Sequence, residues 1–140
     1  MKICIDSDQT GYATKRALIG YLPELNLHDL AAQINLGYPD IAHRLAKKIS
    51  SGEYERGILL CGTGVGMAMM ANKVKGVFAG VANTAEDAAL LYVKHHAQVL
   101  CIGVNDVGPT KAIKLIKAFI SAPHENRINA DRMREIENEL

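Results

Sequence analysis

The sequence has no excess of charge of either sign and no long hydrophobic run. Its 16 lysines and arginines almost balance 15 aspartates and glutamates, which gives a formal net charge of +1, and the basic residues are scattered along the chain. Such a distribution gives no electrostatic reason to expect nucleic acid or a membrane surface as a partner. No apolar run approaches the roughly 20 residues that a membrane-spanning helix needs. We therefore expect neither nucleic acid nor a membrane among the partners.

Cysteine is scarce, and nothing in the sequence looks like a secretory leader. The three cysteines are widely spaced and form no CxxC pair of the kind that holds a metal ion. The first residues, MKICIDSDQ, carry acids where a secretory signal would need an uninterrupted apolar stretch. We expect reduced thiols, no metal site and a cytoplasmic protein.

Low-complexity segments, internal repeats and linker-like stretches are also lacking, so we expect residues 1–140 to form a single domain. Short β-rich runs instead alternate with longer runs of helical character. We predict strands at residues 2–6, 26–31, 56–61, 77–82 and 98–103, and helices at 11–22, 38–52, 84–96, 109–122 and 129–140, with one more helix after the glycines at 62–66.

Strands that are apolar on both faces and separated by helices indicate a parallel sheet covered on both sides. With right-handed crossovers, the fold class is α/β: a doubly wound, Rossmann-like, five-stranded parallel sheet with helices on both faces and a C-terminal helix. Ligands in such folds bind beyond the carboxyl ends of the strands. We therefore expect the functional residues at 6–9, 61–64, 83–84 and 103.

A glycine-rich turn, CGTGVG at residues 61–66, follows the third predicted strand. Gly62, Gly64 and Gly66 allow the backbone to approach a ligand and to direct several N–H groups into one space. Such a turn stabilises a bound phosphate or an oxyanion that develops during a reaction. Its spacing is not that of the dinucleotide fingerprint, and no Walker lysine follows it. From the glycines alone, a purely structural tight turn fits equally well.

Cys61 favours the catalytic interpretation of this turn. A cysteine at the mouth of a strand-to-helix turn is exposed to the helix N-terminus, which favours the thiolate and makes it a usable base or nucleophile. Cys4 and Cys101 lie inside predicted strands, where packing explains them. Thr63 would either hydrogen-bond a substrate oxygen or cap the helix.

Other polar residues allow two interpretations each. Asp6 and Asp8 would hold sugar hydroxyls or cap the helix that follows, and for Asp6 we favour the cap. Lys94, His95 and His96 close a predicted helix, where cations suit the dipole. Adjacent histidines do not share one helix face, which argues against a metal pair, although one of them reaching the ligand edge is an alternative.

Three arginines, at positions 127, 132 and 134, lie near the C-terminus. Arginine side chains clamp phosphate groups through two parallel hydrogen bonds. A solvated helix face is the alternative explanation for such a cluster.

The stretch CGTGVGMAMMANKVKGVFAGV at residues 61–81 resembles the ribose-5-phosphate isomerase B family, which also includes the galactose-6-phosphate isomerase subunits. The resemblance covers essentially the whole chain. Its elements occur in the family's order: Ser7-Asp8 after the first strand, Tyr38-Pro39, the CGTGVG turn, Asn72-Lys73 and VLCIG at residues 99–103.

The resemblance implies a metal-free and cofactor-free aldose–ketose isomerisation of a phosphorylated sugar through an enediolate. It also implies a homodimer or homotetramer whose active sites are shared between subunits. The implied roles are Cys61 as the base, Thr63 and the amides of Gly62, Gly64, Val65 and Gly66 for the enediolate oxygen, Asp8 and Tyr38 for the sugar, and Arg127 and Arg132 for the phosphate across the interface.

The sequence departs from the family pattern where rings are opened and phosphate is bound. Gln9 stands where the family has His, so we count it among the substrate-binding candidates. The family's His-Asn pair falls on Lys94-His95, or on His95 or His96 after a one-residue slip, and its histidine is associated with ring opening. The family's basic residue after the fifth strand is replaced around residues 104–105, and Arg132 lies one position further along than the pattern requires.

These departures leave several alternatives. The substrate could be a tetrose 4-phosphate, which cannot close a furanose ring because its C4 oxygen carries the phosphate. Lys94 or His95 could instead open the ring of a pentose or hexose phosphate, or a related subunit in a hetero-oligomer could supply the missing groups. The alternative from another class is a non-catalytic sugar-phosphate-binding module, which would have no need for a base at Cys61.

Overall fold

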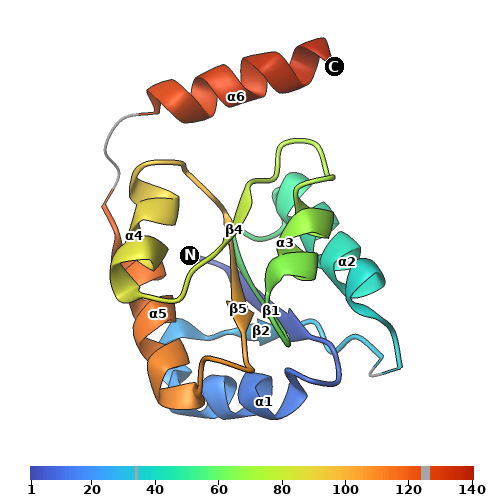
Figure 1. The fold of residues 1–140 in the computed structure, drawn as a ribbon, viewed down its shortest axis with the longest axis vertical. Helices are drawn as coiled ribbons and strands as arrows, with labels where there is room; N and C mark the ends of the chain where they lie inside the picture. The colour runs from blue at the N-terminus through green and yellow to red at the C-terminus, as the bar shows by residue number, and fades with distance from the viewer. Residues whose placement is uncertain (34, 124–126) are drawn as a thin grey trace.

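The computed structural model describes residues 1–33, 35–123 and 127–140. The predicted α/β fold is confirmed: five parallel strands form one sheet in the order β2-β1-β3-β5-β4 (Figure 1). The strands are β1 (Ile3–Ser7), β2 (His28–Asp29), β3 (Arg56–Cys61), β4 (Ala79–Val81) and β5 (Val99–Gly103). The helices are α1 (Tyr12–Tyr21), α2 (Tyr38–Ser50), α3 (Val65–Ala71), α4 (Ala85–Val93), α5 (Pro109–Ser121) and α6 (Ile128–Glu139), with a short 3-10 turn, η1, at Pro23–Leu25.

The central strands are buried on both faces, as expected for a parallel sheet between two helical layers. One core packs α1, α4 and α5 against one face and includes Ile5, Ile58 and Leu100. The other packs α2 and α3 against the opposite face and includes Cys4, Leu59 and Cys61. Because side chains alternate along a strand, Cys61 faces the α2–α3 layer.

Several predicted elements are shorter in the structure, and for two of them the backbone explains why. The expected strand at residues 26–31 is only His28–Asp29, because Asn26 and Ala31 on either side have left-handed φ values of 49° and 52°. The expected helix at 84–96 ends at Val93. The chain then turns at His96, which has a left-handed φ of 53°, and the Ala97 amide donates to the Leu91 carbonyl across that turn.

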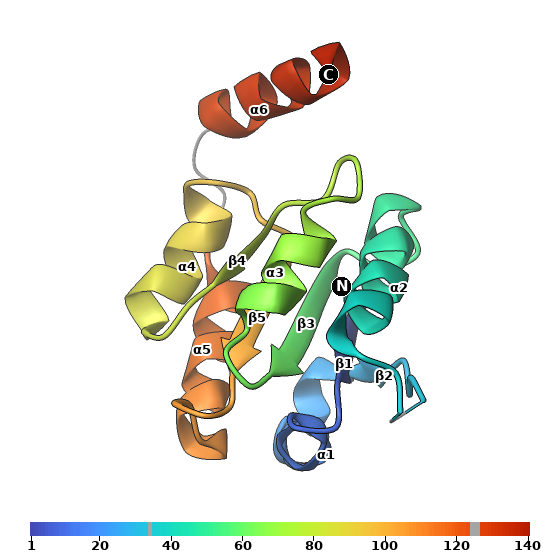
Figure 2. The same cartoon turned by 45° about the vertical axis from the view of Figure 1, so that its right-hand side comes forward.

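The parallel sheet has two chemically different edges. The carboxyl ends of all five strands lie at one edge, where β1 and β3 lead into α1 and α3. Helix α6 lies beyond the opposite, amino edge (Figures 1 and 2). It is attached there to one turn: Arg134 donates to the Gly76 carbonyl at 2.9 Å, and the Glu137 carboxylate accepts from the Gly76 amide at 2.9 Å. Among the described helices, none is long and apolar enough to cross a membrane.

Candidate active site

Cys61 ends β3 at the carboxyl edge and lines a cavity of about 430 Å³. The thiol-bearing residue is 6% exposed. The other lining residues come from three loops or helix starts, and most of them were predicted from the sequence: Asp8, Tyr38, Gly62, Thr63, Val65, Gly66 and Met69. The structure therefore brings the CGTGVG turn, Asp8 and Tyr38 together around one sulfur.

The glycine-rich turn holds that sulfur through its own backbone. The Gly64 amide donates a hydrogen bond to the Cys61 Sγ at 3.2 Å, and the Val65 amide donates to Thr63 Oγ1 at 3.3 Å. Gly64 has a φ of 79°, and a Cβ placed there would lie 3.2 Å from the Gly103 nitrogen. Thr63 Oγ1 thus accepts from the backbone of the turn, but the N-cap residue of α3 is Gly64 and the helix has no side-chain cap, so the helix-cap interpretation of Thr63 is not confirmed. The first amides of α3, among them those of Val65 and Gly66, have no intrahelical acceptor, as in any helix.

The other two cysteines have a different environment. Cys4 and Cys101 are fully buried. Burial raises the pKa of the Cys4 thiol to about 12, and burial together with the neighbouring Cys61 raises the pKa of Cys101 further still. Both are therefore protonated at neutral pH, in agreement with the packing role expected for them.

Asp6 lies in β1 and Asp8 in the loop that follows it, and Asp8 makes the hydrogen bond near the start of α1. Asp8 Oδ1 accepts at 3.0 Å from the amide of Gly11, the residue that precedes the helix. The expectation that Asp6 is the cap was wrong. Asp6 is fully buried, and its carboxylate forms an ion pair with Lys15 at 3.2 Å. The reason is that the Asp6 side chain points into the protein from the strand, whereas Asp8 lies in the loop beside the first free amides of the helix.

Tyr38 and Gln9 lie at the rim of the carboxyl edge. Tyr38 is the first residue of α2 and is 43% exposed, and its ring lies directly over Gly66. A Cβ at Gly66 would come within 2.5 Å of that ring. Gln9 is exposed in the β1–α1 loop, where its carbonyl accepts from the Tyr12 amide at 3.3 Å. It is not among the residues that line the Cys61 cavity.

The remaining predicted site residues lie at the amino edge of the same sheet. Helix α4 runs back from the carboxyl edge, so Lys94, His95 and His96 follow its end and precede β5. Lys94 and His95 are exposed, whereas His96 is 4% exposed. The six residues of β3 separate the two edges by about 17 Å at roughly 3.3 Å per residue. Lys94, His95 and His96 therefore lie far from the carboxyl edge of their own chain, contrary to the alternative that one of them reaches it.

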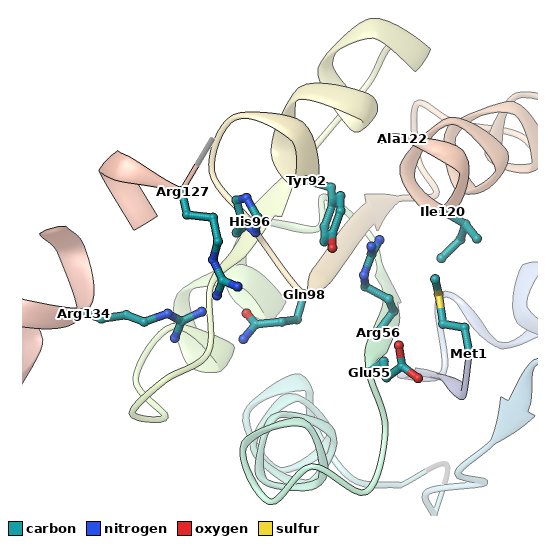
Figure 3. A pocket seen from close by; sticks show the side chains of 10 residues that line it. All are labelled: Met1, Glu55, Arg56, Tyr92, His96, Gln98, Ile120, Ala122, Arg127 and Arg134. Atoms are coloured by element: carbon teal, nitrogen blue, oxygen red, sulfur yellow. The ribbon is translucent and has the colours of Figure 1, made fainter. Parts of the chain in front are cut away.

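A cavity of about 490 Å³ lies at this amino edge and is rich in cations. Arg56, Arg127, Arg134 and His96 line it, with Glu55 as the one carboxylate among the described residues of the lining (Figure 3). The Arg127 Nε lies 3.9 Å from Asp131, a weak and exposed pair. Arg132 is outside the lining, and it is exposed and paired with Glu135 at 3.0 Å. Of the two predicted phosphate ligands, only Arg127 lines this cavity.

Sequence reasoning missed two buried cations. Arg56 is 5% exposed, with its guanidinium 3.3 Å from the centre of the Tyr92 ring and a hydrogen bond to the Phe119 carbonyl at 3.1 Å. Burial lowers the pKa of Arg56. Lys15 is 1% exposed. A signal for Lys15 was present, because it falls on the apolar stripe of α1 together with Leu18 and Leu22.

The described residues contain no cluster of three or more His, Cys, Asp or Glu side chains that could hold a metal ion. The chemistry available at the carboxyl edge therefore consists of a thiol, a hydroxyl, a carboxylate, a phenol and backbone amides. This set can move a proton and stabilise an oxyanion.

Comparison with known proteins agrees with this set of groups. Residues 3–136 match the model of a family described as Ribose/Galactose Isomerase. The chain is 33% identical to "Ribose-5-P isomerase B" of Listeria innocua, over 98% of this chain and 97% of the relative. It is 34% identical to "D-erythrulose-4-phosphate isomerase" of Pectobacterium atrosepticum, over 97% of this chain and 93% of the relative. A crystal structure of ribose-5-phosphate isomerase B from Mycoplasma genitalium with bound ribulose-5-phosphate superposes with a TM-score of 0.87, at 35% identity and with coverage of 99% of this chain and 95% of that one.

Proposed function

Because this chain belongs to the ribose/galactose isomerase family, and is accordingly an aldose–ketose isomerase of phosphorylated sugars, we propose that the reaction takes place in the Cys61 cavity with Cys61 as the base. The observation that carries the proposal is the contrast among the three cysteines. Cys4 and Cys101 are fully buried, whereas Cys61 is 6% exposed, lines a cavity and accepts a hydrogen bond at its sulfur from the Gly64 amide.

The reaction needs one base that works on both sides of a C1–C2 bond. The Cys61 thiolate takes the proton from C2 of the aldose, the C1–C2 double bond forms, and the carbonyl π electrons move onto O1 as an enediolate. The same thiol then returns the proton to C1, while the hydroxyl proton of O2 passes to O1 and leaves the ketone at C2. Backbone amides at the start of α3 and the Thr63 hydroxyl stabilise the negative oxygen.

We propose that a second copy of the chain completes each site. A phosphorylated sugar brings about two negative charges, but the described residues that line the Cys61 cavity include no Lys, Arg or His. The cavity at the amino edge has Arg56, Arg127 and Arg134 instead, and it lies at the opposite edge from Cys61. Two copies placed with opposite edges together would give each Cys61 cavity the Arg127, Arg132 and Lys94-His95 side chains of the other. The exposed apolar residues of α6, Ile128, Met133 and Ile136, support such a packing.

Mixing two inactive variants tests this sharing. Cys61→Ala lacks the base and Arg127→Ala lacks a phosphate ligand, so each alone should be inactive. In a dimer of one chain of each kind, one site carries both substitutions and the other carries neither. An equal mixture after subunit exchange should therefore recover about a quarter of wild-type activity. A mixture that stays inactive although mixed dimers form would show that the two residues serve the same chain.

The sugar that we place first is a tetrose 4-phosphate. A furanose substrate needs an acid–base group for ring opening, and the described lining of the Cys61 cavity contains no imidazole. A tetrose 4-phosphate does not form that ring because its C4 oxygen is esterified. The similarity to an erythrulose-4-phosphate isomerase supports this choice, and ribose 5-phosphate is the competing substrate, with His95 of the other copy in the ring-opening role. A base that must stay reduced fits the cytoplasm.

Proton NMR in D2O tests the function and the base together. Erythrose 4-phosphate, ribose 5-phosphate, allose 6-phosphate and galactose 6-phosphate would be offered separately to wild type, Cys61→Ala and the control Cys4→Ala. We expect deuterium from solvent to enter the sugar as ketose forms, with wild type and Cys4→Ala, and no exchange with Cys61→Ala. Exchange that survives in Cys61→Ala would remove Cys61 as the base. Binding without exchange for every sugar would favour the non-catalytic module.

A further inference from the structure

Lys15 is a charged side chain in the interior of the protein, 1% exposed. It lies on α1, on the stripe that carries Leu18 into the core. A buried ammonium is costly unless carboxylates and hydrogen bonds compensate for it. The surroundings of Lys15 supply that compensation from two different strands.

The Lys15 Nζ bridges two carboxylates. It lies 3.2 Å from Asp6 Oδ1, at the end of β1, and 2.9 Å from Asp29 Oδ1, at the end of β2. The ring of Tyr12 lies on another side of it, 5.1 Å away at its centroid. Burial would raise the pKa of Asp29, but hydrogen bonds from Lys15 and from the Ala31 amide outweigh burial and lower it, so this carboxylate is ionised at neutral pH.

Each carboxylate also holds a backbone amide of the loop that follows β2. Asp29 Oδ1 accepts from the Ala31 amide at 2.8 Å, and Asp6 Oδ2 accepts from the Ala32 amide at 3.3 Å. Ala31 has a left-handed φ of 52°, a conformation that a residue with a Cβ adopts only when its surroundings impose it. Lys15 therefore joins α1, the end of β1 and the loop after β2 into one cluster.

This cluster lies behind two walls of the Cys61 cavity. Two residues after Asp6, the chain reaches Asp8, and the loop after Ala32 leads to Tyr38 at the start of α2. Asp8 and Tyr38 both line the cavity. The Asp8 amide also donates to the Leu60 carbonyl of β3, at 3.3 Å. Cys61 and the turn at 62–66 have an additional support that does not involve the cluster, because the carbonyls of Cys61 and Gly62 accept hydrogen bonds from Val104 and Asn105 after β5.

We propose that Lys15 is a positioning residue for the sugar: by bridging Asp6 and Asp29 it fixes Asp8 and Tyr38 without touching the substrate. The inference rests on the proposed function of the Cys61 cavity. Because the proton-transfer turn has its own support, loss of Lys15 acts on sugar binding and leaves the chemical step nearly unchanged.

The test removes the bridge while avoiding an uncompensated buried charge. Lys15→Met alone leaves Asp6 buried without its counter-ion, so the principal variant is Lys15→Met/Asp6→Asn, which removes both charges at similar volume. Arg16→Met is the matched control, because Arg16 neighbours Lys15 and touches Asp29 at 3.5 Å but is 59% exposed at its side chain. Steady-state isomerisation, thermal unfolding and amide hydrogen exchange are measured on all three proteins.

For the double variant we expect a folded protein with KM raised about tenfold or more and kcat within about twofold of wild type. Amide exchange of residues 28–38 should become faster while exchange of 57–66 stays the same, and Arg16→Met should match wild type in each measurement. A folded double variant with wild-type KM, or one that loses kcat at unchanged KM, would overturn the proposal.

The exchange measurement separates this proposal from the proposed function. If wild type isomerises no sugar phosphate, the proposed function fails and the sugar-positioning role fails with it, although faster exchange at 28–38 would still show the anchoring of the loop. If wild type is active and exchange at 28–38 is unchanged in the double variant, Lys15 does not anchor that loop, and the positioning proposal alone is wrong.

Discussion

The amide of Gly64 donates a hydrogen bond to the sulfur of Cys61 at 3.2 Å, three residues back along the chain. The thiol is thus held by the same turn that ends its strand and begins α3. The group that holds it is a backbone amide and not a side chain of another wall of the cavity. This arrangement separates the proposed base from the groups proposed to recognise the sugar, and several measurable consequences depend on it.

The three thiols should differ in their reactivity. Cys61 lines a cavity open to solvent, whereas Cys4 and Cys101 are fully buried with raised pKa values. We expect an alkylating reagent at pH 8 to modify Cys61 in the native protein and the other two only after unfolding. Peptide mass spectrometry identifies the modified residue. Modification of Cys101 in the folded protein would contradict the packing described here.

Gly64→Ala should damage both stability and activity. Alanine at this position would have to adopt the left-handed φ of 79° that Gly64 has, and its Cβ would lie 3.2 Å from the Gly103 nitrogen. We expect a loss of about 1–3 kcal/mol in the free energy of unfolding and a large fall in kcat. Gly52→Ala is the matched control, because its φ is 81° but nothing lies within 4 Å of the new Cβ. The control should lose stability from φ alone, about 1 kcal/mol, and keep full activity.

Gly66→Ala should move Tyr38 without affecting the base. Its Cβ would come within 2.5 Å of the Tyr38 ring, and the ring is half exposed and free to swing outward. We expect KM to rise severalfold with a smaller change in kcat, measured by steady-state kinetics. Gly20→Ala, inside α1 with nothing within 4 Å, should instead stabilise the protein by about 0.5–1 kcal/mol. Unchanged KM in Gly66→Ala would exclude Tyr38 from sugar binding.

Alkaline pH should destabilise the fold through Cys4. Its pKa rises from an ordinary value of 9.0 to about 12 on burial. Between these values the unfolded chain releases this proton and the folded chain keeps it, so the free energy of unfolding falls by about 1.4 kcal/mol per pH unit for this group. Below pH 9 the contribution is complete. In Cys4→Ala this slope is absent, so urea unfolding from pH 8 to 10.5 should show the stability difference from wild type shrinking. A constant difference would contradict the assignment.

Much of the fold could be predicted from local patterns. Apolar strands such as 56–61 and 98–103, separated by amphipathic helices, indicate a parallel sheet. The position of Cys61 at the end of one of these strands places it at the carboxyl edge of that sheet. The extent of β2 could not be predicted, because it ends at Asp29, just before Ala31, whose left-handed conformation depends on the Asp29 carboxylate. Tertiary contacts of this kind leave no trace in local periodicity.

The distribution of the site residues was also beyond local reasoning. The sequence indicated Lys94, His95, Arg127 and Arg132 as site candidates beside Cys61, but it does not state which edge of a sheet each residue occupies. Helix α4 runs in the opposite direction to the strands, and this places Lys94 and His95, which follow it, at the amino edge. The Asp6–Lys15 pair was missed because a buried charge becomes visible only when its partners, distant in sequence, are brought beside it.

The placement of Cys61 and Arg127 at opposite edges of one sheet has an evolutionary consequence. With each site shared between two copies as proposed, selection can change the residues of the amino edge, and with them the sugar that a neighbouring copy accepts, while the turn that carries Cys61 in the same gene is inherited intact. After a gene duplication, each daughter gene needs to preserve only one of the two edges. An obligate pair of unlike chains, one contributing the thiol and the other the cations, is therefore a short mutational distance from an assembly of identical ones.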